Sequence, residues 1–240
     1  MSVAPASSIF QRGKRLLRAA LVAVVAMGGA GCVRAPRPTG YLGNYNGLVR
    51  QPLTYFGIYA QPMPAAKKPR LDHVLQILPS RWDAPRLPES ALEKELLDLL
   101  DDRLQVFLQR YAPPSVIVTR RRDIEDLEGT GANVTQLRCS ITYWDKGVGI
   151  LRPLFGAFYL GPTQLQVEGT VVDWRTREAL LRFARRGLGT GVVIGLMTPQ
   201  SVSAKFCWRL SINETADLLA QYVVSQLRPP PQNWWRSAAR

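Results

Sequence analysis

Residues 163–185 read TQLQVEGTVVDWRTREALLRFAR, and this stretch decides the predicted fold because it holds two strands and the turn between them. In residues 163–173 apolar and polar side chains alternate, a period of two that indicates a strand with one buried face. Residues 174–177 read WRTR, a tight turn, and residues 178–185 return alongside the first strand. We therefore predict an antiparallel hairpin. The residues predicted to face inward on the first strand are Leu165, Val167, Gly169 and Val171.

Three further stretches predict strands that extend this hairpin into a sheet. Residues 133–145 alternate with the same period and place Cys139 and Tyr143 together on the inward face. Residues 71–78 are a short apolar run that Pro79 follows, and residues 115–119 read SVIVT. Both are typical of short buried strands.

Two helices are predicted. Residues 90–111 begin with the capping box SALE and carry leucine at helical spacing, and prolines from Pro113 end the pattern. The last helix lies within residues 203–227. It begins either at a second capping box, SINE at residues 211–214, or further back, because one apolar stripe continues to Ala204. These patterns predict an α+β fold: a mostly antiparallel sheet of about five strands covered by two amphipathic helices.

The first 31 residues have the layout of a secretory signal peptide. Four basic residues and no acidic residue occupy the first 18 positions, and the next 13 positions are uncharged. This run is shorter than the roughly 20 apolar residues that a spanning helix needs. Residues 29–32, GAGC, resemble a bacterial lipobox, although Gly29 stands where a branched apolar residue is usual. The resemblance implies that Cys32 is acylated and becomes the first mature residue. An ordinary signal peptide or an uncleaved anchor is the alternative.

Two features after Cys32 bear on location and family. Val33 stands where lipoproteins kept at the inner membrane of enteric bacteria commonly carry aspartate, so we expect a lipid anchor in the outer membrane, facing the periplasm. Residues 40–48, GYLGNYNGL, resemble the mature N-terminus of a family of uncharacterised bacterial lipoproteins, Gly-Phe-Leu-x-x-Tyr-x-x-Leu. That family is a domain of unknown function, so the resemblance implies an envelope location and no particular activity.

The chain of 240 residues is predicted to have four parts. These are a lipoprotein signal peptide (1–31), a proline- and aromatic-rich N-terminal arm (32–70), a single α+β domain (71–228) and a C-terminal tail (229–240).

Two segments are candidates for contact with a partner because they are richer in apolar side chains than exposed connections usually are. One is the arm, which we expect to lie against the domain or against a partner. The other is the loop at residues 147–161, which either folds back as core or presents a contact patch. The candidate residues are Tyr41, Tyr45, Tyr55, Phe56, Leu154, Phe155, Phe158 and Tyr159.

The remaining two cysteines, Cys139 and Cys207, allow two interpretations. In an oxidising periplasm they can form a disulfide, and otherwise they are two separate small buried side chains. The sequence predicts neither a metal nor a cofactor. His73 is the only histidine, and GLGTG at residues 187–191 lacks the third glycine of a dinucleotide loop.

The formal net charge of +13 raises the question of nucleic acid, but an exported protein rarely meets any. Anionic lipid head groups or an acidic partner are better counterparts. We therefore predict a protein that is not an enzyme, a binding or assembly accessory held in the envelope through Cys32, with an envelope protein of unknown identity as partner. The alternatives are a transport or secretion accessory that binds a lipid or glycan, and a periplasmic hydrolase that uses carboxylates.

Overall fold

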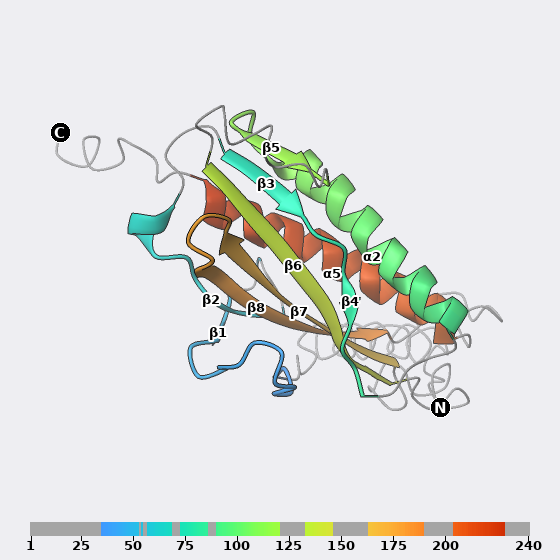
Figure 1. Ribbon diagram of the computed structural model, residues 1–240. Coiled ribbons are helices and arrows are strands. Elements are labelled where there is room, and N and C mark those ends of the chain that lie inside the picture. The colour runs from blue at the N-terminus through green and yellow to red at the C-terminus, as the bar shows by residue number, and fades with distance from the viewer. Residues whose placement is uncertain are drawn as a thin grey trace, which may run out of the picture.

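The computed structural model describes residues 35–52, 54, 57–68, 73–85, 90–120, 133–145, 163–189 and 204–228. Within these ranges one sheet of eight strands is covered on one face by two long helices (Figure 1). The strands are β1 (Val49–Arg50), β2 (Ile58–Gln61), β3 (His73–Ile77), β4 (Arg81–Trp82), β5 (Val116–Thr119), β6 (Asn133–Asp145), β7 (Thr163–Asp173) and β8 (Ala179–Gly189). The helices are α2 (Ser90–Tyr111), α5 (Ala204–Leu227) and the 3-10 turn η2 (Ala65–Lys67).

The predicted hairpin is confirmed as β7 and β8. The two strands pair antiparallel, and β8 continues beyond the predicted residue 185 to Gly189. Gly169 lies inward on β7, as predicted, and the ring of Phe183 occupies the space that a side chain there would need. A β-carbon added at this glycine would lie 2.4 Å from Cζ of Phe183 and 2.7 Å from the carbonyl oxygen of Arg138.

The sheet is mixed, so the prediction of a mostly antiparallel sheet of about five strands was wrong. Its strands run in the order β1-β2-β8-β7-β6-β3-β5, with β4 beside β6. Strand β3 is parallel to both β5 and β6, and β4 is parallel to β6. The physical reason is α2, which carries the chain from the end of β3 back to the start of a parallel neighbour. Strands β1, β2 and β4 are two to four residues long, too short to show a period in the sequence.

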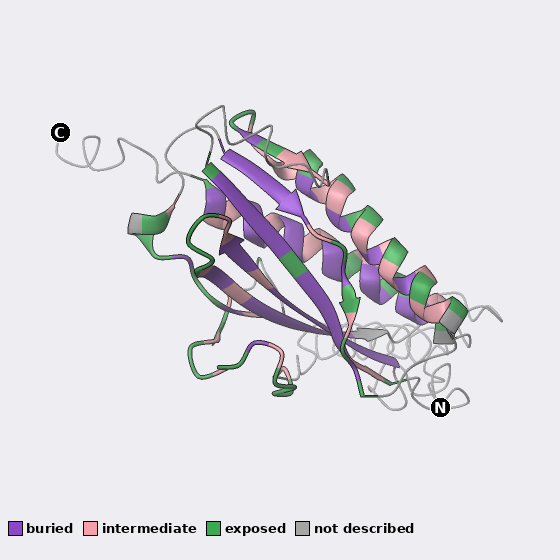
Figure 2. Cartoon of the chain, viewed as in Figure 1, coloured by how far each residue is buried: buried purple, intermediate pink, exposed green. Residues whose placement is uncertain are grey.

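Both helices lie side by side on one face of the sheet, and the main core is between them and the strands (Figures 1 and 2). Helix α2 has the predicted bounds, and its leucine stripe is at most 1% exposed. The stripe consists of Leu96, Leu100, Leu104 and Leu108. Spacing of four residues places these side chains on one side of the helix, which explains why α2 covers the sheet.

Helix α5 is continuous from Ala204 to Leu227, which decides between the two predicted starts. The second capping box does not begin a helix, because it lies inside α5. Glu214 forms an ion pair with the buried Arg185 of β8 at 2.6 Å. Ser211 lies against Gly187, where an added β-carbon would come 2.3 Å from its oxygen. A glycine on β8 thus allows the helix to approach the sheet closely.

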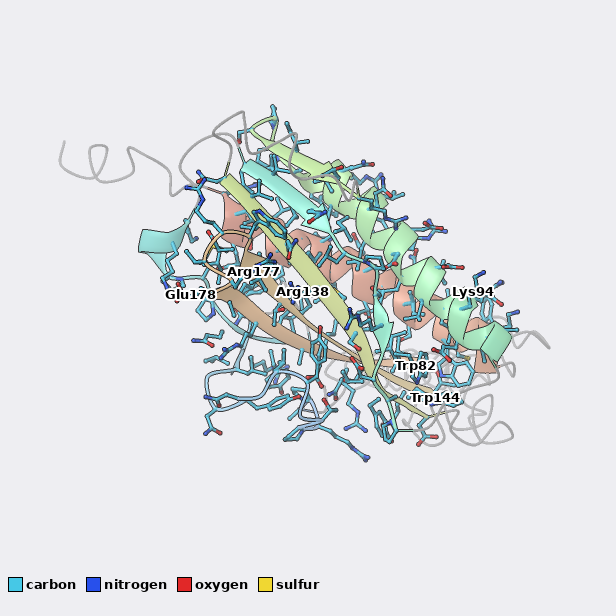
Figure 3. The ribbon with its side chains drawn as sticks, viewed as in Figure 1. Trp82, Lys94, Arg138, Trp144, Arg177 and Glu178 are labelled. Atoms are coloured by element: carbon cyan, nitrogen blue, oxygen red, sulfur yellow. The ribbon has the colours of Figure 1, made fainter. Side chains whose placement is uncertain are left out.

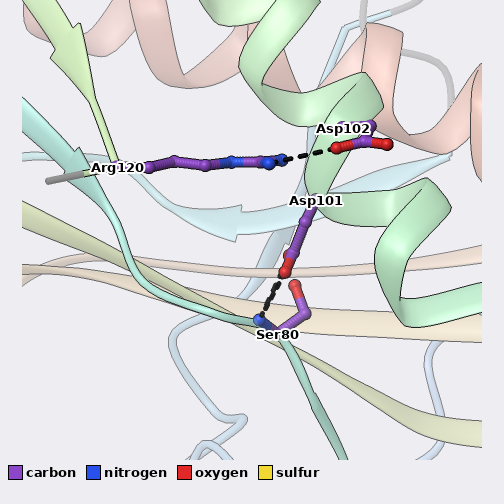
Figure 4. Close-up of polar contacts among 4 residues, drawn as sticks. All are labelled: Ser80, Asp101, Asp102 and Arg120. Carbon is purple, nitrogen blue, oxygen red and sulfur yellow. Dashed lines mark hydrogen bonds and ion pairs between the residues drawn. The ribbon is translucent and has the colours of Figure 1, made fainter. Parts of the chain in front are cut away.

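Neighbouring acids of α2 make different contacts (Figure 4). Both carboxylate oxygens of Asp101 accept hydrogen bonds from the backbone N–H of Ser80, at 3.1 and 3.2 Å. Asp102 points away and pairs with Arg120 at 3.0 Å. Burial raises the pKa of Asp101, and the hydrogen bonds from Ser80 oppose that shift. These contacts tie the middle of the helix to the segments that follow β3 and β5.

A β-bulge between Ile141 and Tyr143 changes the facing of the last residues of β6. Tyr143 was predicted on the inward face with Cys139, and the bulge turns it to the opposite face instead. Trp144 takes the inward position and packs against Trp208 of α5, with ring centroids 4.9 Å apart.

Candidate functional site

The sheet has a second face, opposite the helices, that is lined by polar side chains. We call it the open face. Its residues alternate with the core residues along β6, β7 and β8. They are Gln136, Arg138, Ser140, Thr142, Gln166, Glu168, Thr170, Arg182 and Arg186. Several are buried although polar, so they require hydrogen-bond partners.

Glu168 is the centre of this face. Its side chain is fully buried, and its carboxylate accepts four hydrogen bonds. Two donors come from the sheet: the hydroxyl of Thr142 at 2.8 Å and the amide of Gln166 at 2.6 Å. The other two come from the N-terminal arm: the hydroxyls of Thr39 at 2.8 Å and Tyr45 at 2.5 Å. The arm therefore supplies two of the four hydrogen bonds to a buried carboxylate.

The GYLGNY stretch of the arm forms the turn that delivers these donors. Gly40 and Gly43 have φ angles of 94° and 68°, a left-handed conformation that glycine adopts without strain. The N–H of Gly43 donates to the carbonyl of Gly40 at 3.0 Å, which closes the turn. Leu42 is 6% exposed, and the Tyr45 hydroxyl also accepts the backbone N–H of Thr39. The glycines and Tyr45 of the sequence motif thus have a structural explanation.

Arg37 is the first residue that fixes the arm to the sheet. Its N–H donates to Oε1 of Gln166 at 2.8 Å, and its carbonyl accepts from Nε2 of the same side chain at 2.7 Å. The Gln166 amide therefore pairs with the arm as a neighbouring strand would. The Arg37 guanidinium lies 4.6 Å from the ring centre of Tyr143, and Arg186 lies 5.0 Å from the same ring.

A second polar cluster lies on the open face near the hairpin turn. The side chains of Arg138 and Arg177 both donate to Oε1 of Gln136, at 3.0 and 3.4 Å. Gln136 is buried, and its amide nitrogen donates to Oε1 of Gln76 at 2.9 Å. The Arg177 guanidinium lies 3.9 Å from the ring centre of Trp174. Figure 3 shows Arg138 and Arg177 near each other over the strands.

His73 lies in the core and not on the open face. It is 1% exposed, and its Nε2 is 2.8 Å from the hydroxyl oxygen of Thr135. Burial lowers its pKa to about 4, and the nearby charge of Asp173 opposes the shift. The imidazole is therefore neutral at pH 7, which suits a structural histidine.

Cys139 and Cys207 are both buried and no disulfide joins them. Cys207 is next to Trp208, which packs on Trp144, five residues beyond Cys139 along β6. In this structure both are small buried thiol side chains.

Of the predicted contact residues, the structure brings Tyr41 and Tyr45 to the domain, where burial raises the pKa of the Tyr41 phenol. The described part of the arm lies on the open face, and β2 is part of the sheet, which therefore begins before residue 71. Seven other predicted residues lie outside the described ranges. They are Cys32, Tyr55, Phe56, Leu154, Phe155, Phe158 and Tyr159.

Sequence reasoning missed Glu168, Gln166 and the cluster around Gln136. On strands, polar residues opposite an apolar face predict contact with water, and no local signal shows that an arm covers them. Among the described residues, no group of three or more His, Cys, Asp or Glu side chains is arranged to hold a metal ion. Within the same residues, neither long helix has the length and apolar character that crossing a membrane requires.

No protein-family model and no curated protein matches the sequence. Solved structures similar to this chain include the PelC dodecamer of Paraburkholderia phytofirmans, with a TM-score of 0.41, 12% identity, and coverage of 68% of this chain and 96% of that one. Another is a Xanthomonas campestris protein of the domain-of-unknown-function family DUF330 (TM-score 0.37, 10% identity, coverage 64% and 84%). A third is a Helicobacter pylori homolog of a neuraminyllactose-binding hemagglutinin (TM-score 0.35, 11% identity, coverage 68% and 89%).

Proposed function

We propose that this chain is a lipid-anchored cell-envelope protein that acts as a non-catalytic binding or assembly accessory. In this proposal Cys32 carries the acyl chains in the periplasmic leaflet of the outer membrane. The arm then holds the open face of the sheet close to the bilayer, and an envelope protein is the partner.

The observation that carries the proposal is the position of the first arm contact. Arg37 pairs with Gln166 on the open face, and it is the fifth residue after Cys32. Five fully extended residues span at most about 17 Å. An acylated Cys32 would therefore keep Gln166 within that distance of the lipid head groups. Two or more acyl chains make such attachment effectively stable, since each buried methylene contributes about 0.8 kcal/mol.

The chemistry of the open face supports binding in preference to catalysis. The Glu168 carboxylate is occupied by four neutral donors, so its lone pairs already have partners. His73 is buried beneath the helices and neutral at pH 7. Neither group is presented to a substrate.

The anchor is tested by labelling cells with radioactive palmitate and comparing the wild type with the Cys32→Ser variant. We expect the label in the wild type and its loss in Cys32→Ser. Cys207→Ser is the matched control, because Cys207 is buried in the fold and should leave labelling unchanged. Equal labelling of wild type and Cys32→Ser would remove the lipid anchor from the account.

The partner is tested by photo-crosslinking in cells from Tyr55 and Phe155. A crosslinker at Lys94, an exposed residue of α2, serves as the control (Figure 3). We expect a defined protein product from Tyr55 or Phe155 and none from Lys94. Products with lipid alone from both positions would replace the assembly role by lipid binding.

A further inference from the structure

We propose that Arg138 and Arg177 form a binding site for a phosphate group, and that its physiological source is the head group of an anionic phospholipid. The choice of a lipid rests on the proposed membrane anchor, whereas the site itself rests on geometry. Both guanidinium groups donate to one neutral oxygen, Oε1 of Gln136.

This arrangement brings two positive charges together over one neutral acceptor. The two donor nitrogens share one acceptor, at 3.0 and 3.4 Å, so they are at most 6.4 Å apart, a distance at which like charges repel. In the described part of the chain no carboxylate pairs with either arginine, and the acid next to Arg177, Glu178, is paired with Lys67. A bound anion would relieve the repulsion, and arginine pairs match the oxygens of a phosphate in a bidentate manner.

The supporting residues fix the site. The buried Gln136 amide donates to Gln76, so its oxygen is turned toward the arginines. Arg177 stacks on Trp174 at 3.9 Å, which holds its guanidinium in place.

The backbone at Arg177 gives independent support. Its φ angle is 60°, in the left-handed region where a hairpin turn favours glycine. A side chain at such a position is strained, and strain of this kind concentrates at functional sites. The arginine is thus present at a position where glycine would fit the backbone better.

The position of the site favours a lipid. Arg138 is opposite Thr170 on β7, four residues from Gln166, to which Arg37 of the arm is bonded. Four strand residues correspond to roughly 13 Å, so the pair shares the open face with the arm and its predicted anchor. Basic groups close to a membrane surface are attracted to anionic head groups.

The test is calorimetric titration of the full chain, in an uncharged detergent, with dihexanoyl-phosphatidylglycerol, dihexanoyl-phosphatidylcholine and inorganic phosphate. We expect saturable binding of the anionic lipid, weakened about tenfold or more in Arg138→Gln and in Arg177→Gly, because each loses charge-assisted hydrogen bonds. Arg177→Gly should fold at least as well as the wild type, since glycine relieves the positive φ. Arg175→Gly, the same charge change in the same turn, is the matched control and should bind normally.

The outcomes test two claims separately: that the arginine pair binds a phosphate group, and that this phosphate belongs to a lipid. Loss in both variants, with Arg175→Gly unchanged and the anionic lipid preferred, supports the lipid site. Equal affinity for inorganic phosphate, with the same variant pattern, supports the site and overturns the lipid source. Equal binding by the wild type and the Arg138→Gln/Arg177→Gly double variant overturns the site. Repeating the titration with Cys32→Ser keeps this result independent of the anchor.

Discussion

The hydroxyl oxygen of Tyr45 lies 2.5 Å from Oε2 of Glu168, 123 residues further along the chain. This contact joins the arm to the centre of the sheet and satisfies a carboxylate that is fully buried. Hydrogen bonds to a charged acceptor are stronger than neutral ones, and a buried carboxylate that loses a donor is costly. The arm is therefore a structural part of the domain as well as its connection to Cys32.

Tyr45→Phe removes this donor and keeps the ring. We expect the free energy of unfolding to fall by about 1–3 kcal/mol in urea denaturation, and trypsin to cleave faster after Arg50. Tyr59→Phe is the control, because Tyr59 lies on β2 and its hydroxyl makes no hydrogen bond to any residue that the structure describes. Equal effects of the two substitutions would mean that the Glu168 contact does not hold the arm.

Gly169→Ala tests the close packing of the hairpin. The new methyl group would lie 2.7 Å from the carbonyl oxygen of Arg138, which is backbone and cannot move aside cheaply. We expect a loss of several kcal/mol in the free energy of unfolding, as for other overpacked core sites. Gly47→Ala is the control, since its nearest neighbour is the flexible Gln61 side chain at 3.4 Å. A melting temperature for Gly169→Ala close to that of the wild type would contradict the register of β7 and β8.

His73 predicts a specific pH dependence of stability. Burial lowers its pKa from 6.5 to about 4, so between these values the unfolded chain binds a proton that the folded chain does not. Stability contributed by the neutral imidazole is therefore present above pH 6.5 and is lost as the pH falls toward 4. The loss is up to about 3 kcal/mol, and His73→Gln should lack it. Urea unfolding at several pH values measures both proteins. Parallel pH profiles would show that this histidine does not titrate on unfolding.

Long helices and strands with a clear hydrophobic period could be predicted from the sequence. Very short strands, and which strands pair with each other, could not. Helix α2 and strands β6 and β7 have the predicted bounds, because each carries a full apolar stripe or alternation. The parallel pairing of β3 with β5 depends on where α2 packs, which no local pattern reports. The β-bulge before Tyr143 changes the face of the sheet to which the following side chains point, and no glycine or proline marks it in the sequence.

The candidate site was predictable only on the arm side. The aromatic residues around Tyr45 predicted that the arm makes contacts. The hydrogen-bond partner of Tyr45, Glu168, is one of several polar residues on β7, and nothing in the sequence distinguishes it. Arg177 belongs to a turn in which arginine is ordinarily a solvated residue, and its left-handed φ becomes visible only in the structure. Long-range pairing, and not composition, distinguishes these residues from their neighbours.

The mature N-terminus is predicted to be acylated Cys32. Trypsin digestion of protein extracted from membranes should release the peptide Cys32-Val33-Arg34 with acyl chains, detected by mass spectrometry. Cys32→Ser should yield no such peptide. Recovery of the leader joined to an unmodified Cys32 would rule out the lipid anchor.

The most direct test of the account is the orientation of the domain on a bilayer. A fluorophore is placed on Asn46→Cys in the arm or on Lys94→Cys in α2, both exposed positions, and the acylated protein is reconstituted into vesicles with head-group quenchers. Cys139 and Cys207 are buried, and burial raises the pKa of the Cys139 thiol, so labelling is selective. We predict strong quenching at position 46 and weak quenching at position 94. Equal quenching at both positions, or stronger quenching at position 94, would contradict an open face held against the membrane.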